Sequence, residues 1–486
     1  MLSKQNFRDF FVSRITLISS LALLSSCATG NEIIQPKPTD PKSGNSEVVC
    51  WLTAPGTSIY LKKQNVALNF SSTLNSNPAI LVDSTSQYQT MDGFGFAMTG
   101  GSAFLINKLA KSDKSKLINE LFSNDSTAIA ISYLRISIGS SDLNSSVFSY
   151  DDIAPSSTDT TLQYFSIKPD SLDLIPVLKS ALAINPKIKI LGSPWSAPAW
   201  MKTNKSAKGG SLLPQYYGTY ARYFVKYIQA MKENGITIDA ITPQNEPLNP
   251  DNNPSMFMSA EQEALFVKNY LGPEFVKADI KTKIILFDHN CDLYNYPLTI
   301  LNDPDARKYS DGSAFHLYGG NIISLTTVHN AYPDKNVYFT EQWVGAPSNL
   351  GEDLKWHVKN LIIGAPRNWS KNVIEWNLAS DSNFDPHTSG GCGTCLGGLT
   401  INNEVSSRNA SYYIIGHASK FVPMGSIRID SSILTNLPNV AFLTPTGKKV
   451  LIVLNEGSST QTFNIQFKNK IVTHNLAAGA VATYVW

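Results

Sequence analysis

Eight short apolar runs recur through the middle of this chain, and they constrain its fold more than any other feature. Each run is followed by a polar or glycine-containing loop, and often by a helical stretch such as Gln215–Asn234 or Ala260–Leu271. Near-continuous apolar strands that alternate with helices are typical of parallel strands buried on both faces. The runs begin at Gly93, Tyr133, Lys187, Ala240, Lys283, Ser313, Asn336 and Val373. Eight such units predict a (β/α)₈ barrel, an α/β fold, over residues 91–410.

The two ends of the chain have a different pattern. Residues 48–90, and again the stretch from about Ser426 to Trp486, contain short β-prone runs separated by Asn, Ser, Pro and Gly. Such spacing is typical of antiparallel strands. A length of 486 residues leaves room for a barrel and a smaller β-structure beside it.

The first 47 residues have the pattern of a lipoprotein signal followed by a tether. The apolar run Ile15–Leu24 follows basic residues and is too short to span a bilayer. It leads into Leu24-Ser25-Ser26-Cys27, which resembles a bacterial lipobox in which Cys27 is acylated. Residues 28–47 are rich in Pro, Gly, Ser, Thr and Asn and predict a flexible tether. We therefore expect a lipid anchor in a membrane of the bacterial cell envelope; an ordinary signal peptide with an incidental cysteine is the alternative.

Composition narrows the class of partner. Lys and Arg number 40 against 38 Asp and Glu, a net charge of +2, and such a balance argues against nucleic acid as the partner. The chain contains 22 Phe, 20 Tyr and 8 Trp, whose rings can stack on the C–H faces of sugars. We expect a monomer that acts on a sugar-like ligand.

Polar and aromatic side chains lie within or near the carboxyl ends of the apolar runs, where barrels build their active sites. Carboxylates at the ends of apolar strands are costly unless they are paired or functional. Two glutamates follow the fourth and seventh runs, which a barrel brings face to face across its mouth. The residues at these ends are Arg135, Trp195, Glu246, Asp288, His316, Glu341 and Trp376.

Glu246 and Glu341 suit retaining glycoside hydrolysis, in which one carboxylate attacks the anomeric carbon and the other protonates the leaving oxygen. Arg135 and Tyr318 are expected to reach Glu341 and favour its ionised form. Asn245, beside Glu246, is expected to hydrogen-bond the sugar hydroxyl next to the anomeric centre. Two carboxylates suffice for this chemistry, so no metal or cofactor is expected. For either glutamate alone, a structural ion pair is the alternative.

Three motifs resemble glycoside hydrolase family thirty, the family of lysosomal glucosylceramidase. They are Gln89–Gly95 (QTMDGFG), Ser193–Asn204 (SPWSAPAWMKTN) and Gly416–Pro423 (GHASKFVP), and the resemblance extends from about residue 48 to the C-terminus. It implies that residues 48–90 and 411–486 form one antiparallel β-sandwich appended to the barrel. It also implies that Glu246 is the acid/base and Glu341 the nucleophile.

The same resemblance implies glucose contacts from Asp142, Trp195, Asn245 and Trp376. His316 and Tyr318 match a further part of the pocket. Each of these residues has a structural alternative. Trp195 and Trp376 could be core aromatics, and Asp142 could be a turn residue in Ser140-Ser141-Asp142. His316 is expected to orient a neighbour rather than to act as acid or base.

Cys392 and Cys395 form a CxxC in the loop after Trp376. A disulfide is the expected state in an oxidising compartment, since a zinc site would need two more ligands and a redox role its own fold context. This loop departs from lysosomal glucosylceramidase and resembles the family branch that cleaves β-1,6-glucan. We therefore expect an endo-β-1,6-glucanase. Glucosylceramidase or another β-glucosidase is the enzymatic alternative, and a carbohydrate-binding protein on a barrel scaffold is the non-enzymatic one.

Overall fold

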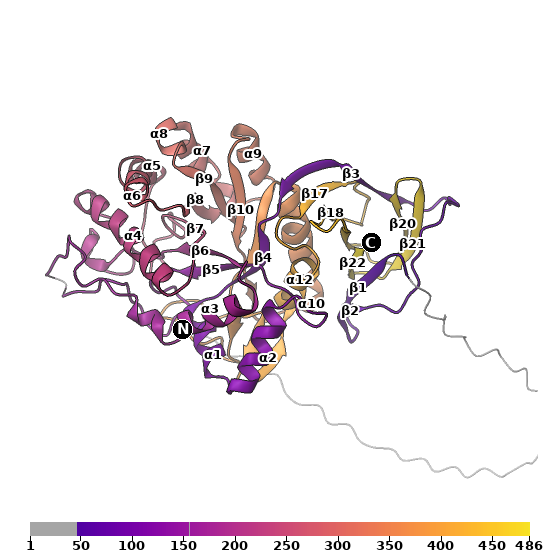
Figure 1. Ribbon diagram of the computed structural model, residues 1–486, viewed down its shortest axis with the longest axis horizontal. Coiled ribbons are helices and arrows are strands. Elements are labelled where there is room, and N and C mark those ends of the chain that lie inside the picture. Colours follow the sequence, from indigo (N-terminus) through magenta and orange to yellow (C-terminus); the bar gives the residue numbers. More distant parts are fainter. Residues whose placement is uncertain (1–45, 155) are drawn as a thin grey trace, which may run out of the picture. The chain divides into compact units, whose positions relative to one another are not determined.

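Eight parallel strands close into a barrel in the computed structural model, which describes residues 46–154 and 156–486. Each apolar run of the sequence forms one strand, and the (β/α)₈ prediction is confirmed (Figure 1). Around the barrel the order is β10-β12-β4-β5-β6-β7-β8-β9, with every neighbouring pair parallel. The strands are β4 (Gly93–Ala97), β5 (Tyr133–Ser137), β6 (Lys189–Ser193), β7 (Ala240–Ile241), β8 (Lys283–Asn290), β9 (Ser310–His316), β10 (Asn336–Glu341) and β12 (Ser370–Glu375).

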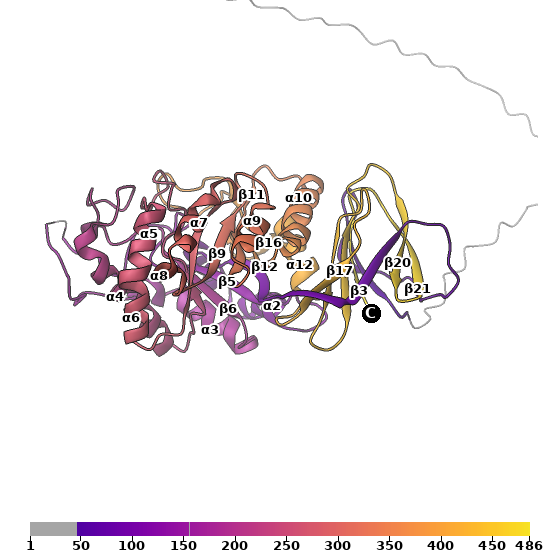
Figure 2. The same ribbon diagram turned by 90° about the horizontal axis from the view of Figure 1, so that it is seen from above.

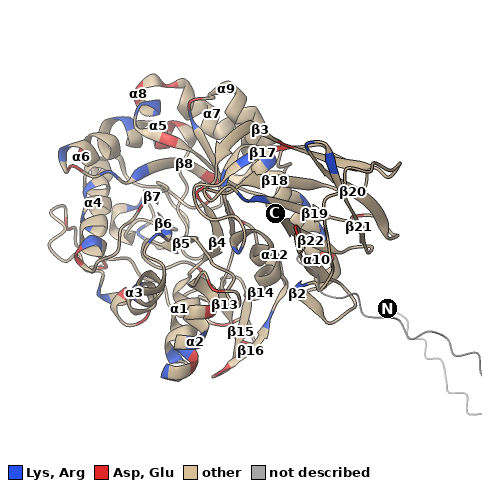
Figure 3. Ribbon diagram, turned by 45° about the vertical axis from the view of Figure 1, so that its right-hand side comes forward, with Lys and Arg blue, Asp and Glu red and all other residues tan. Residues whose placement is uncertain are grey.

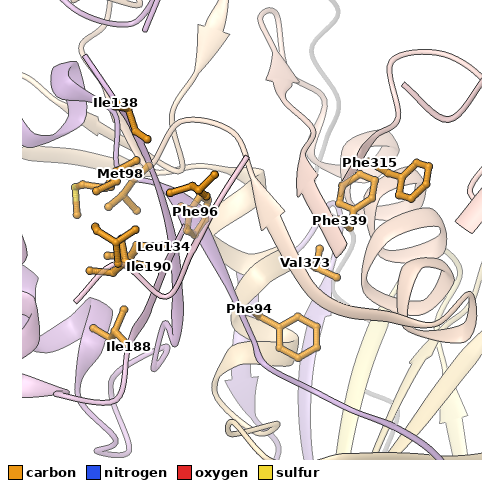
Figure 4. Packing of buried hydrophobic residues seen from close by; sticks show 14 of the residues in the cluster. Phe94, Phe96, Met98, Leu134, Ile138, Ile188, Ile190, Phe315, Phe339 and Val373 are labelled. Carbon is orange, nitrogen blue, oxygen red and sulfur yellow. The ribbon is translucent and has the colours of Figure 1, made fainter. Parts of the chain in front are cut away.

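Side chains of the strands alternate between the barrel interior and the layer beneath the helices. On β5, Leu134 and Ile136 belong to the outer core, together with Phe96, Ile190 and other residues drawn in Figure 4. Tyr133 packs instead in a separate inner cluster of barrel residues. Arg135, two positions after Tyr133, shares its face and is fully buried inside the barrel. The strands are apolar on both faces because both are covered, and Arg135 is one of the few polar residues that are buried inside the barrel.

Helices surround the barrel strands (Figures 1 and 2). The predicted helix Gln215–Asn234 is α4 (Tyr217–Glu233), whose buried face consists largely of aromatic residues. Helix α5 (Ala260–Phe266) continues through the π-helical turns 267–271 into α6 (Gly272–Lys277), and α10 (Leu350–His357) continues through 358–364 into α11 (Ala365–Arg367). The others are α1 (Gly100–Lys108), α2 (Lys111–Phe122), α3 (Leu174–Ile184), α7 (Asn295–Asn302), α8 (Pro304–Arg307), α9 (Ser324–Ala331) and α12 (Ala410–Ser419).

Both chain ends contribute to one nine-stranded sheet, which folds around its own core of buried residues. Its order is β2-β1-β22-β19-β18-β17-β3-β20-β21. The strands are β1 (Val49–Ala54), β2 (Ile59–Lys63), β3 (Ala79–Thr90), β17 (Ile427–Ser431), β18 (Asn439–Leu443), β19 (Lys449–Leu454), β20 (Gln461–Phe467), β21 (Lys470–Leu476) and β22 (Val481–Val485).

One pairing in this sheet differs from the expected antiparallel pattern, because β20 runs parallel to β3. Strand β3 is long and serves both halves of the sheet. Its first residues, 79–82, pair with β20, while the stretch from Val82 to Thr90 pairs antiparallel with β17. Parallel pairing is possible here because β3 comes from the opposite end of the chain and is not joined to β20 by a hairpin, which would require antiparallel strands.

The described residues of barrel and sheet belong to one compact unit, and α12 packs against both. His417 on α12 lies within hydrogen-bond distance of Thr53 on β1 (2.8 Å) and Thr483 on β22 (2.9 Å). Within the described residues, no helix is long and apolar enough to cross a membrane. The predicted signal peptide 1–27 with Cys27 lies outside the described residues, as does the tether 28–47 except for Ser46 and Glu47.

Candidate active site

A cavity of about 550 Å³ opens at the carboxyl ends of the barrel strands. Positive and negative residues are interspersed over outer helices such as α2 and α8 (Figure 3). Inside the barrel mouth, by contrast, three carboxylates surround one guanidinium and one imidazole. Seven of the predicted site residues line the cavity, and Arg135 and His316 lie buried beneath it. The seven are Asp142, Trp195, Asn245, Glu246, Tyr318, Glu341 and Trp376.

Glu341, the last residue of β10, is held by both donors that the sequence predicted. Arg135 donates to Oε2 at 2.5 Å, and the hydroxyl of Tyr318 donates to Oε1 at 2.9 Å. Burial raises the pKa of Glu341, and the charges of His316 and Arg135 only partly offset this, so its pKa lies above the usual value. The two donors leave the carboxylate little freedom to rotate.

Glu246 follows β7 in a left-handed backbone conformation, with φ of 44°. A residue before proline normally adopts an extended conformation, so the backbone at Glu246 is strained, at a cost of roughly 1–3 kcal/mol. The N–H of Glu246 donates to the Asp288 carbonyl at 3.0 Å, which holds this conformation. Its side chain bonds to His316 Nδ1 at 3.2 Å and accepts from the Asn249 amide at 2.7 Å. In this conformation the carboxylate of Glu246 lies beside His316.

His316 and Glu246 are joined by a hydrogen bond whose proton either residue can carry. Burial raises the pKa of Glu246, but the hydrogen bond and charge of His316 outweigh it and lower the pKa to about 2. Burial lowers the pKa of His316, while the negative charges of Glu341 and Asp288 and the bonds to Asp288 and Glu246 raise it to about 9. Without substrate, the proton therefore lies on the imidazole and Glu246 is ionised.

Asp288 connects the strand ends and has a larger part in the site than its sequence context indicated. The sequence indicated only that Asp288 is a carboxylate at the end of an apolar run, and no role was predicted for it. Burial raises the pKa of Asp288, but Arg135 and His316 outweigh it and hold the pKa well below its usual range. Its carboxylate is fully buried and accepts hydrogen bonds from Arg135 (2.8 Å), His316 (3.1 Å), Ser193 (2.7 Å), Thr242 (2.8 Å) and Thr340 (2.6 Å).

Arg135 also orients Asn245 and lies against the two tryptophans. Its Nη2 donates to Asn245 Oδ1 at 2.6 Å, which leaves the amide NH₂ as the group that can donate to a sugar hydroxyl. Trp195 and Trp376 stack with ring centroids 5.3 Å apart, and the guanidinium lies 4.9 Å and 5.7 Å from their centroids. Both tryptophans are mostly buried, as the core alternative implied, yet both also line the cavity.

Asp142 lies in the cavity wall, with its side chain almost fully buried. Burial and the negative charge of Glu341 raise the pKa of Asp142 to about 7. Its Oδ2 accepts from the backbone N–H of Cys392 at 3.3 Å. Cys392 and Cys395 form the expected disulfide, and both line the cavity. Among the described residues, the one His/Cys/Asp/Glu group spaced to share a metal ion is Glu246, His316 and Glu341, so these cysteines do not form a zinc site.

Several residues that sequence reasoning did not single out also line the cavity. Around Glu246 these are Leu248, Asn249, Pro250, Asp251, Asn252, His289 and Asn290. Trp343 lies in the same cavity, two positions after Glu341. The segment Leu248–Asn252 directly follows the Asn-Glu-Pro motif. Its position next to Glu246 was the one sequence feature that could have predicted it as part of the site.

Comparison with known proteins places this site in a family. Residues 91–422 match the glycosyl hydrolase family 30 TIM-barrel domain, and residues 425–484 match the glycosyl hydrolase family 30 beta sandwich domain. The chain is 35% identical to endo-1,6-beta-D-glucanase neg1 of Aspergillus fumigatus, over 77% of this chain and 81% of that one. It is 28% identical to lysosomal acid glucosylceramidase of Mus musculus, over 82% of each chain.

Solved structures agree with these relatives. The endo-beta1,6-glucanase BT3312 superposes with a TM-score of 0.83 at 35% identity, covering 91% of this chain and 100% of that chain. SrfJ from Salmonella typhimurium superposes with a TM-score of 0.84 at 28% identity, covering 90% of this chain and 99% of that chain. The family models together span the barrel and most of the sheet. This chain therefore belongs to glycoside hydrolase family 30 and is a glycosidase.

Proposed function

We propose that this protein is a retaining endo-β-1,6-glucanase in which Glu341 is the nucleophile and Glu246 the general acid/base. The observation that supports this most strongly is the spacing of the two carboxylates. One oxygen of Glu246, one of Glu341 and a ring nitrogen of His316 all lie within 4.8 Å of one another. Retaining glycosidases hold their carboxyl groups about 5–5.5 Å apart, whereas inverting ones leave about 6.5–9.5 Å for a water molecule.

Glu341 is suited to attack the anomeric carbon because Arg135 and Tyr318 fix its orientation. As the new C–O bond forms, the bond to the leaving oxygen breaks and that oxygen takes a proton from Glu246. In the second half-reaction, Glu246 as a carboxylate removes a proton from water, which attacks the same carbon and releases Glu341. Glu246 thus acts first as an acid and then as a base, Glu341 first attacks and then leaves, and two displacements at one carbon give a product that retains the β configuration.

His316 supplies the means by which Glu246 changes protonation state. Its Nε2 lies 3.1 Å from Asp288 and donates to that ionised carboxylate, so Nδ1 can either donate to Glu246 or accept from it. A sugar ring that covers the site removes water, and loss of water favours a neutral pair over an ion pair. Substrate binding therefore moves the shared proton toward Glu246, where the leaving oxygen needs it.

The lining around Glu246 favours a sugar as the leaving group. Asn249, Asn252 and Asn290 offer amide groups, and Asp251 and His289 add further polar atoms beside Leu248 and Pro250. Amides and carboxylates match the hydroxyls of a second glucose unit. A ceramide would place hydrocarbon chains against these groups and leave them unpaired, which is unfavourable. The endo-1,6-beta-glucanase names of two relatives, each 35% identical to this chain, point to the same linkage.

Glucosylceramide hydrolysis is the second candidate, because a glucosylceramidase is also among the relatives. Purified protein would be incubated separately with β-1,6-glucan, β-1,3-glucan and glucosylceramide, with Glu341→Gln as the inactive control. We expect β-1,6-linked oligosaccharides of several lengths early in the reaction, with the β anomer formed first by NMR. Faster release of ceramide than of gluco-oligosaccharides, or an α product formed first, would contradict the proposal.

We also propose that the protein acts as a monomer held on a membrane of the bacterial envelope through Cys27. The support is the lipobox-like sequence and the Pro- and Ser-rich stretch that follows it. Detergent-phase partitioning of the full chain tests this: we expect the native protein in the detergent phase and Cys27→Ser in the aqueous phase. Equal partitioning of the two would overturn the anchor.

A further inference from the structure

The loop that contains Cys392 and Cys395 forms part of the cavity wall near Asp142. Cys395 is buried and packs with Leu143, Trp195 and Trp376 in a small cluster under the cavity. Cys392 is half-buried, and the two residues between the cysteines are exposed. The disulfide therefore joins a buried anchor, Cys395, to a residue at the cavity surface.

Asp142 depends on this loop on two sides. The N–H of Thr388 donates to the Asp142 carbonyl at 2.7 Å, and the N–H of Cys392 donates to its carboxylate at 3.3 Å. Gly391 lies so close to Asp142 that an added Cβ would sit 2.6 Å from the Asp142 carbonyl oxygen. Of these contacts, the Cys392 bond is the one that reaches the carboxylate.

The buried cysteine is in turn attached to the strand of the nucleophile. Cys395 begins β14 (Cys395–Leu396), which pairs antiparallel with β11 (Val344–Gly345), three residues beyond Glu341. The carbonyl of Cys395 also accepts from Asn377 at 3.2 Å, next to Trp376. A continuous path of strand pairing, disulfide and hydrogen bond thus connects the chain after Glu341 to the carboxylate of Asp142.

We propose that the Cys392–Cys395 disulfide is a positioning element of the sugar site, which holds the Cys392 N–H against the Asp142 carboxylate. The inference rests on the proposed function and on the glucose contact that the family resemblance implies for Asp142, which lines the cavity. Without the disulfide, two backbone bonds still hold this segment, one from the Thr388 N–H to the Asp142 carbonyl and one from the Ala346 N–H to the Thr394 carbonyl. Cys392 and the exposed Gly393 then gain freedom, and the bond to the carboxylate is lost while the surrounding fold remains.

Reduction of the full chain tests this. Cys50 and Cys291 are already buried thiols, so among the described residues a reductant changes only this bond. After thiol counting confirms two new thiols, we expect kcat/KM on β-1,6-glucan and on an aryl β-glucoside to fall about tenfold, the loss that one hydrogen bond of about 1.4 kcal/mol accounts for. The double variant Cys392→Ser, Cys395→Ser should show the same fall, and reductant should have no further effect on it.

A double-mutant cycle with Asp142→Asn shows whether the disulfide acts through the Asp142 carboxylate or only makes the loop more rigid. If the disulfide acts through Asp142, reducing the Asp142→Asn variant changes kcat/KM less than twofold. An equal tenfold fall in that variant, or unchanged kinetics of the reduced native protein, would overturn the inference. Binding of D-glucose, measured by calorimetry in oxidised and reduced protein, makes the same comparison without turnover. Inactivity on β-1,6-glucan would contradict the proposed function alone. The role of the disulfide would then be tested by the affinity for D-glucose in the oxidised and reduced protein.

Discussion

Two glutamates of the same chemical kind receive different partners in this site. Glu341 accepts from a guanidinium and a phenol, which fix its orientation, and Glu246 exchanges a proton with an imidazole and accepts from an amide. Environment, rather than residue type, therefore separates the two functions. Substitution of Glu246, or of a residue that bonds to it, should therefore affect proton transfer to the leaving oxygen.

Glu246→Ala removes the proton donor while leaving Glu341 and its partners in place. We expect kcat/KM on β-1,6-glucan to fall by about 10²–10⁴, the usual contribution of general acid–base catalysis. A dinitrophenyl β-glucoside, whose leaving group needs no proton, should lose far less in the step that forms the glycosyl-enzyme. Equal losses on the two substrates would show that Glu246 is not the acid.

Asn249→Leu removes the amide that donates to Glu246 at 2.7 Å. This donor favours the carboxylate and helps keep the pKa of Glu246 low. His316, His289 and Glu341 also face Glu246 and stay unchanged. Without this donor the pKa of Glu246 should rise. Because the acid form is lost as pH rises through the pKa of the proton between His316 and Glu246, activity should extend to higher pH.

The measurement for Asn249→Leu is the basic limb of kcat/KM against pH. Asn252→Leu is the matched control, because Asn252 lines the same cavity without a bond to Glu246. A basic limb that stays in place, or moves to lower pH, would show that Asn249 does not tune the acid.

At the scale of elements, the barrel could be predicted from sequence because burial on both faces leaves a local pattern of apolar runs. Even β7, which is only two residues long, was among the eight predicted runs. The parallel pairing of β3 with β20 left no such pattern, since it joins segments more than 370 residues apart. The hub at Asp288 was missed for the same reason, because its five donors come from different strands and loops.

Asp288→Asn tests whether one carboxylate holds the strand ends together. Arg135 would lose one of its two acidic partners and remain buried, and breaking a buried pair costs about 3–5 kcal/mol. We expect denaturant unfolding to show a loss of that order, together with loss of activity. Asp279→Asn, an exposed aspartate paired with Lys281, is the control and should change stability little. A similarly small loss of unfolding free energy in both variants would show that Asp288 does not hold the strand ends together.

At the scale of the whole described molecule, α12 joins the barrel to the sheet through His417. Burial lowers the pKa of His417 from 6.5 to about 3, so it stays neutral between two threonines. The unfolded chain binds this proton below about pH 6.5, and stability should therefore fall as pH drops from 6.5 toward 3. His316, whose pKa is raised to about 9, acts in the opposite direction, and its contribution is lost as pH rises from 6.5 through 9.

His417→Asn should lower the melting temperature at neutral pH, because the contacts to both threonines change. It should also flatten the decline of melting temperature between pH 6.5 and 4, since the buried imidazole is gone. Thermal unfolding of the two proteins across this range gives the comparison. Parallel curves for the native protein and the variant would show that His417 does not set the acid limit of stability.

The assignment of Glu341 as nucleophile and Glu246 as acid/base can be tested by trapping the covalent intermediate. A 2-deoxy-2-fluoro-β-glucosyl fluoride slows both displacements but has a leaving group good enough for the first, so the glycosyl-enzyme accumulates. Mass spectrometry of peptides from the inactivated protein then locates the sugar. We predict one fluoroglucosyl group on the peptide that contains Glu341, and its release with recovery of activity when an acceptor is added. A label on Glu246 or on any other residue would contradict the assignment of the nucleophile.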